Sequence, residues 1–337
     1  MVLNKQLVIN KLPSLVIGNL VSELPIIQGG MAVRVSMSKL AAAVSNEGGI
    51  GIVAASGIGP EELYEEIIKA YELSPGGNIG LNVMAAVQEA KDLVIAGIAA
   101  GAKLIIMGAG FSKDVMKICK SAGVPFALII SHAEFAFKAE RLGASAVIIE
   151  GKDAGGHLGT LTQNAFEIYE DIKTIEKEKG IKLGIPAILA GGILNGKDIK
   201  RTLDIGASGV QMGSRFALTF ESNACPLWKQ AVVECTEADI IIIESPVGMP
   251  GRALNNDFIK SFYNPEIPKP KIKCQGCLKD CSRIYCILEA LDEARKTGKG
   301  VIFVGERASE IKDVISVEEV FRRLKKEYEE AITKEGV

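Results

Sequence analysis

Residues 146–159 read Ala-Val-Ile-Ile-Glu-Gly-Lys-Asp-Ala-Gly-Gly-His-Leu-Gly, an apolar run followed at once by a glycine-rich loop. The run Ala146–Ile149 predicts a strand buried on both faces, as in a parallel sheet. Glycine tolerates positive φ and lets the backbone approach a ligand closely. His157, one of two histidines in the chain, lies in this loop. An imidazole on a strand-end loop is well placed for proton transfer, the alternative being a tight turn with an incidental surface histidine.

The same pattern of apolar run and helical segment repeats through residues 24 to 220. Eight runs predict strands: Leu24–Ile27, Ile50–Ala54, Ile79–Met84, Leu104–Met107, Phe126–Ile130, Ala146–Ile149, Ala187–Ala190 and Gly209–Met212. The segments between them predict helices over 36–47, 60–73, 87–100, 112–122, 132–142, 162–179 and 196–205, with a last helix beginning near 214. Such alternation is typical of parallel strands joined by right-handed crossovers. Eight strands in about 190 residues favour a closed (β/α)8 TIM barrel over an open sheet.

Composition places the chain among ordinary globular proteins. Of 337 residues, 48% are apolar and 24% charged, which suits a sizeable core, and the net charge of −2 gives no reason to expect nucleic acid or an acidic membrane as a partner. The chain shows no signal peptide and no apolar run of membrane-spanning length, so we expect a cytoplasmic protein. Seven cysteines without secretory targeting indicate thiols or a metal site, not a disulfide scaffold.

The pattern changes after about residue 222. Residues 244–273 hold five of the twelve prolines and predict a loop-rich lid. Helices are expected again over 283–297 and 317–333. We therefore expect a barrel over residues 1–221 and, over residues 222–337, a lid and C-terminal helical cap that packs on the barrel.

The ends of the seventh and eighth predicted strands carry the strongest candidate binding site. Barrel enzymes place their chemistry at the carboxyl ends of the strands, and many bind a phosphate after strands seven and eight. Backbone amides at these two ends can donate hydrogen bonds to a phosphate. The candidate residues are Ala190, Gly191, Gly192, Gln211, Met212, Gly213 and Ser214. Two purely structural turns are the alternative.

Other strand ends offer contacts to a planar ring. The first strand is followed by Gly29, Gly30 and Met31, and Met31 can provide a soft apolar face. Asn82, in the third strand, can donate and accept hydrogen bonds along a ring edge, unless it is only a turn residue. Gly155 and Gly156, beside His157, complete the candidate cofactor-binding residues.

These motifs together resemble the nitronate monooxygenase (2-nitropropane dioxygenase) family of FMN-binding (β/α)8 barrels. The resemblance covers residues 21–220 and extends to a lid-like segment, Ser245–Leu254. It implies FMN, with its phosphate at Gly191, Gly192, Gly213 and Ser214, and His157 as the general base. The same scaffold is similar to flavin-dependent enoyl-acyl-carrier-protein reductases, which share the Gly-Gly-His loop and use NAD(P)H.

Three functions follow from these observations. The leading one is an FMN-dependent oxidoreductase that oxidises alkyl nitronates or nitroalkanes with O2. The second is an NAD(P)H-dependent enoyl-thioester reductase, and the third a non-catalytic flavin-binding protein, for which His157 would have no use. The partners are then small molecules: a nitronate or an enoyl thioester, with O2 or NAD(P)H. The substrate and the oligomeric state stay open, a homodimer being one option.

A cysteine cluster lies outside this scheme. Cys274, Cys277, Cys281 and Cys286 fall within 13 residues. Their spacing fits neither paired zinc knuckles nor a bacterial ferredoxin run. We therefore assign no metal ligand and expect structural or reactive thiols, with zinc or an iron–sulfur cluster as the alternative.

Overall fold

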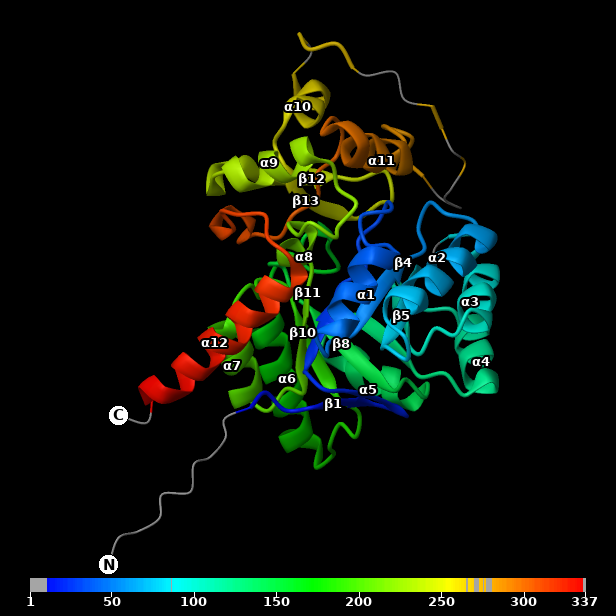
Figure 1. Ribbon diagram of the computed structural model, residues 1–337, viewed down its shortest axis with the longest axis vertical. Helices are drawn as coiled ribbons and strands as arrows, with labels where there is room; N and C mark the ends of the chain where they lie inside the picture. The colour runs from blue at the N-terminus through cyan, green and yellow to red at the C-terminus, as the bar shows by residue number, and fades with distance from the viewer. Residues whose placement is uncertain are drawn as a thin grey trace, which may run out of the picture.

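Eight parallel strands form the central sheet of the computed structural model, which describes residues 11–335 except 86, 265, 270–272, 275 and 277–280. The strands are β3 (Ile26–Gln28), β4 (Gly51–Ala54), β5 (Ile79–Met84), β6 (Ile105–Gly108), β7 (Phe126–Ile130), β8 (Ala146–Glu150), β10 (Ala187–Ala190) and β11 (Gly209–Met212). Their order is β3-β11-β10-β8-β7-β6-β5-β4. A parallel bridge between Ile27 and Ile50 joins the two ends of this order, and the Ile50 N–H donates to the Ile26 carbonyl at 3.0 Å. The predicted (β/α)8 barrel is confirmed (Figure 1).

Helices follow the strands and cover the outside of the sheet. They are α1 (Ser38–Asn46), α2 (Pro60–Leu73), α3 (Ala90–Ala99), α4 (Lys113–Ala122), α5 (Glu134–Arg141), α6 (Ala165–Lys179), α7 (Gly196–Asp204) and the short α8 (Ser214–Ala217). Local sequence explains where some of them begin. Asn164 accepts from the Glu167 N–H while the Glu167 carboxylate accepts from the Asn164 N–H, a capping box that starts α6. All eight predicted strands are present, and no predicted strand end differs from the observed one by more than two residues.

A hairpin closes the amino-terminal end of the barrel. Strands β1 (Leu15–Ile17) and β2 (Leu20–Ser22) pair antiparallel, and Leu15, Ile17 and Leu20 are buried with the aliphatic side chains inside the barrel. The tight turn between them uses Gly18 at φ 58°. The sequence patterns did not predict this hairpin, because its strands are only three residues long.

A cap covers the opposite end of the barrel (Figure 1). It contains α9 (Pro226–Glu234), the 3-10 helix η1 (Glu237–Asp239), β12 (Ile240–Glu244), β13 (Pro250–Leu254), α10 (Asp257–Tyr263), α11 (Ile287–Thr297) and the 3-10 helix η2 (Ala308–Glu310). The segment 244–273, expected to be loop-rich, thus carries a strand and a helix. Its prolines do not prevent this, because Pro250 is the first residue of β13, a position that a proline tolerates.

The chain returns to the barrel in its last helix, α12 (Val317–Glu335), which packs on α7 and α1. Since α8 has only four residues, α12 covers the part of the sheet that an eighth barrel helix would cover (Figure 1). Phe321 is fully buried, with its ring centroid 5.7 Å from that of Phe216. The segment expected as cap, 222–337, therefore also supplies one helix of the barrel wall.

None of the helices in the described part of the chain is both long enough and apolar enough to cross a membrane.

Phe321→Ala tests whether α12 is part of the barrel core. Deleting a fully buried phenylalanine typically costs about 3–5 kcal/mol, so the variant should lose that much free energy of unfolding in a urea titration. Lys326→Ala on the same helix, where the side chain is 66% exposed, should change it by less than about 0.5 kcal/mol. Equal, small effects of the two substitutions would show that α12 is only loosely attached.

Candidate functional site

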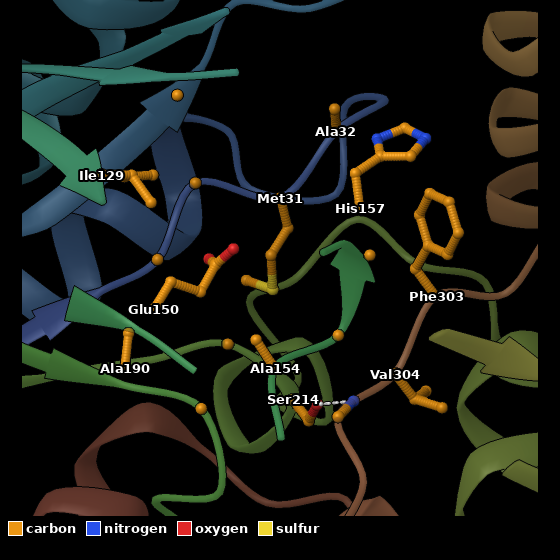
Figure 2. A pocket seen from close by; sticks show the side chains of 18 of the residues that line it. Met31, Ala32, Ile129, Glu150, Ala154, His157, Ala190, Ser214, Phe303 and Val304 are labelled. Carbon is orange, nitrogen blue, oxygen red and sulfur yellow. Dashed lines mark hydrogen bonds between the residues drawn. The ribbon is translucent and has the colours of Figure 1, made fainter. Parts of the chain in front are cut away.

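A cavity of about 380 Å³ lies at the carboxyl ends of the barrel strands, beneath the cap. Every candidate residue from the sequence lines it, although their roles remain predictions: Gly29, Gly30, Met31, Asn82, Gly155, Gly156, His157, Ala190, Gly191, Gly192, Gln211, Met212, Gly213 and Ser214. Parallel strands explain the convergence, because their carboxyl ends meet on one rim. Figure 2 shows part of this lining, with Met31, Glu150 and His157 around the centre of the view.

The two glycine loops after β10 and β11 differ in what surrounds them. Gly191 and Gly192 have positive φ, 97° and 69°, and a β-carbon on Gly191 would lie 2.9 Å from the Ala154 backbone nitrogen. A β-carbon on Gly213 would meet only the Met31 Sδ, at 4.0 Å. The first loop is therefore constrained by its backbone, whereas the space beside Gly213 opens into the cavity.

Polar groups on the barrel rim face this space. Gln211 Oε1 is buried and accepts no hydrogen bond from any residue that the structure describes. Asn82 Nδ2 donates to the Ile106 carbonyl at 3.2 Å, and a β-carbon on Gly30 would collide with the Asn82 side chain at 2.4 Å. A buried acceptor without a donor is costly, so Gln211 indicates a missing hydrogen-bond donor. The N–H groups of a flavin ring would provide such a donor.

His157 sits on β9 (Gly156–His157), which pairs antiparallel with β13 of the cap. Its Nε2 lies 2.6 Å from Ser245 Oγ, and its ring makes an edge contact with Phe303 at 5.0 Å between centroids. Burial lowers the pKa of His157 to about 4, so the imidazole is neutral at pH 7. Figure 2 shows the ring between Ala32 and Phe303.

The loop before His157 is held by a buried arginine of the cap. Arg252 Nη1 donates to the carbonyls of Lys152 and Ala154, and Arg252 forms an ion pair with Glu306 at 3.3 Å. Close packing adds to this anchor, because a β-carbon on Gly155 would lie 2.5 Å from the Val304 carbonyl carbon. The backbone of the cap and the backbone of the loop before His157 are thus in direct contact.

Some titratable groups of the cavity were not predicted from the sequence. Glu150, Asp153 and Arg307 also line it. Burial, and then the neighbouring Glu306, raise the pKa of Asp153 to about 6. The sequence held one signal for Glu150, a charged residue directly after a buried strand. No sequence pattern pointed to Ser245 as a partner of His157, because the two residues lie 88 positions apart in the chain.

The cysteine cluster falls partly outside the described residues, because Cys277 is not among them. Cys274 and Cys281 are exposed, Cys286 is half-buried, and all three are free thiols. In the ranges that the structure describes, no three His, Cys, Asp or Glu side chains are close enough together to hold a metal ion. Structural or reactive thiols at this cluster therefore stay a prediction.

Comparison with solved structures supports the fold. FabK from Thermotoga maritima superposes with a TM-score of 0.79 at 28% identity, covering 93% of this chain and 95% of that one. The nitroalkane oxidase of Streptomyces ansochromogenes superposes with a TM-score of 0.74 at 24% identity, covering 93% and 98%, and shows the shared fold.

Sequence comparison identifies the family. A protein of Bacillus subtilis (strain 168) named "Probable nitronate monooxygenase" is 30% identical over 282 residues, 73% of this chain and 81% of its own length. A protein of Staphylococcus saprophyticus with the same name is 29% identical over 304 residues, 79% of this chain and 85% of its own. The family model for nitronate monooxygenase matches residues 14–100 and 86–327. The chain therefore belongs to the nitronate monooxygenase family and is a flavin-dependent oxidoreductase.

Proposed function

We propose that this protein binds FMN in the cavity and oxidises alkyl nitronates or nitroalkanes with O2, with His157 as the general base. The observation that carries the proposal is a neutral imidazole in the same cavity as an open glycine loop and as Gln211 Oε1, a buried acceptor for which the described residues offer no donor. FMN, when bound, supplies the redox chemistry, while the protein supplies binding and proton management.

The residues present fit a flavin nucleotide. The space beside Gly213, with the glycine amides after β10, suits a phosphate, because only the Met31 sulfur approaches a β-carbon there. Gln211 Oε1 suits an N–H donor of the ring. Met31 offers an apolar surface on the same cavity.

His157 is in a state to accept a proton. Ser245 occupies Nε2, so Nδ1 is the ring nitrogen without a partner among the described residues. A neutral nitroalkane must lose a proton from the carbon next to the nitro group before it becomes a nitronate. Burial disfavours the resulting imidazolium, but the nitronate anion formed beside it favours the charged ring.

A second candidate function, reduction of an enoyl thioester with NAD(P)H, is favoured by the outer wall of the cavity. The cap contributes aliphatic side chains there: Val247, Met249, Ile287, Leu288, Leu291 and Val301. Such a wall suits an acyl chain.

One experiment separates the two candidates. Under anaerobic conditions, flavin reduction by an alkyl nitronate is compared with reduction by NADH and by NADPH. Reduction by the nitronate, with oxygen consumption once O2 is admitted, supports the proposed function. Reduction only by a nicotinamide cofactor rejects it in favour of the reductase. The small-molecule partners, the cytoplasmic location and a homodimer remain predictions.

Gly213→Val tests the phosphate site. The β-carbon of a valine here would meet the Met31 Sδ at 4.0 Å, and its methyl groups would occupy the space proposed for the phosphate. The protein should therefore fold but purify without flavin, as judged from its absorbance spectrum. Gly59→Val is the matched control, since its nearest neighbour, the Glu61 carboxylate, is 3.7 Å away and Gly59 lies outside the cavity lining. Full flavin content in the Gly213 variant would reject this assignment.

His157→Asn tests the general base. The variant should retain flavin and lose about 10²–10⁴-fold in turnover of a neutral nitroalkane, the usual contribution of a positioned proton-transfer group. A preformed nitronate has no such proton to lose, so the variant should oxidise it with a much smaller loss of turnover. Near-native turnover of the neutral substrate would make His157 incidental.

The lowered pKa of His157 predicts a pH-dependent stability. Its folded pKa of about 4 lies below the ordinary value of 6.5, so the unfolded chain takes up the proton first as the pH falls. The stability that the neutral ring contributes is complete above pH 6.5 and is lost between there and pH 4. The difference in free energy of unfolding between wild type and His157→Asn should therefore shrink by up to about 1.4 kcal/mol per pH unit below 6.5. A difference that does not change between pH 7 and 5 would contradict the burial of this ring.

A further inference from the structure

We propose that Glu150 is a substrate-binding residue of this cavity, one that contacts anionic substrates through its carboxyl group. It would donate a hydrogen bond to an oxygen of the nitronate while His157 holds the proton taken from carbon. No covalent bond to Glu150 changes, and the carboxyl keeps its proton. The inference rests on the proposed function in that it takes the substrate to be an anion.

The position of Glu150 follows from the barrel. It is the last residue of β8 and pairs in register with Ala190, the last residue of β10 and a candidate cofactor-binding residue. It lines the same cavity as His157, seven residues further along the chain. Figure 2 shows its carboxyl group directed into the cavity, on the side of Ile129 and Met31, with His157 on the far side of Met31.

Glu150 has no partner within the protein as described. No hydrogen bond or ion pair joins its carboxyl to a residue in the described ranges, although Arg252 and Arg307 lie in the same region and are each paired with other groups. The Glu150 side chain is half-buried and lines the cavity, so its carboxyl is free to contact a ligand there. A ligand that fills the cavity would displace the remaining solvent around the carboxyl and could accept its hydrogen bond.

The charge state of Glu150 supports the role. Burial raises its pKa to about 7, and no neighbouring charge contributes to the rise. The other titratable groups that line the cavity are Asp153, His157 and Arg307. His157 is neutral at pH 7, and Arg307 is paired with Asp198 and Glu310. Burial therefore reverses the usual order of the two pKa values, so that Glu150 holds a proton more readily than His157 does.

Anion binding provides a test that needs no turnover. Isobutyrate is a planar, unreactive mimic of an alkyl nitronate and is anionic between pH 7 and 9. An anion in the cavity repels an ionised Glu150, so binding requires the proton. The affinity of the FMN-loaded protein for isobutyrate, followed by the flavin difference spectrum, should fall up to about tenfold per pH unit over this range.

Glu150→Gln should remove that dependence. The amide can still donate a hydrogen bond but cannot ionise, so the affinity should change by less than about twofold between pH 7 and 9. Glu47→Gln is the control, because the pKa of Glu47 is also raised by burial, but Glu47 pairs with Lys325 at 3.9 Å, outside the cavity. This variant should keep the pH dependence of the wild type. Asp153, with a pKa of about 6, has ionised below this pH range and does not produce it.

Each outcome decides the proposal. A flat profile in the wild type, an equally steep one in Glu150→Gln, or no saturable binding to the wild type at pH 7 would overturn it. Should Glu150→Gln fail to hold flavin, proton uptake on isobutyrate binding to the wild type decides. It is measured by calorimetry above the pKa of Glu150, at a pH of about 8.5, in two buffers of different ionisation enthalpy: close to one proton supports the proposal and none rejects it. If isobutyrate affinity shows the expected pH dependence but nitronate is not oxidised, the proposed reaction is rejected and the role of Glu150 in anion binding is retained.

Discussion

Closure of the parallel sheet is the constraint on which the rest of this protein depends. The bridge between Ile27 and Ile50 joins the first barrel strand to the second and completes a ring of backbone hydrogen bonds. In a closed parallel barrel every strand ends on the same rim. Short segments far apart in sequence, such as Gly29–Met31, Asn82 and Gln211–Ser214, are thereby brought to one cavity. Without closure these strand ends would be spread along an open edge.

The cap completes the cavity by pairing its backbone with the loop that carries His157. Strand β13 of the cap pairs with β9, which carries His157. Arg252 donates hydrogen bonds to the Lys152 and Ala154 carbonyls in the loop before β9. Glycine at 155 lets the Val304 backbone approach at a distance that a side chain would prevent. The histidine is thus fixed from the cap side while its loop originates in the barrel. The cap is therefore part of the cavity wall as well as a cover over it.

Removal of water gives the cavity its electrostatic character. Burial lowers the pKa of His157 and raises that of Glu150, because a charged ring and a charged carboxylate are both less stable away from solvent. At pH 7 the His157 ring is therefore neutral, and Glu150 is close to the midpoint of its titration. A cavity that disfavours net charge on its own residues can respond strongly to a charged ligand, since interactions in a low-dielectric site are little screened.

The sequence by itself determined the barrel and most of its rim. Short apolar runs and helical patterns identify strands and helices locally. Strand-end glycines such as Gly191 and Gly213 are visible because a parallel barrel puts binding residues directly after its strands. The tertiary structure alone decided the remainder. The pairing of Ser245 with His157 joins residues 88 positions apart, and the return of α12 to the barrel wall depends on packing around Phe321. The shifted pKa values of His157 and Glu150 depend on burial. Burial arises from contacts between distant segments and leaves no local pattern in the chain.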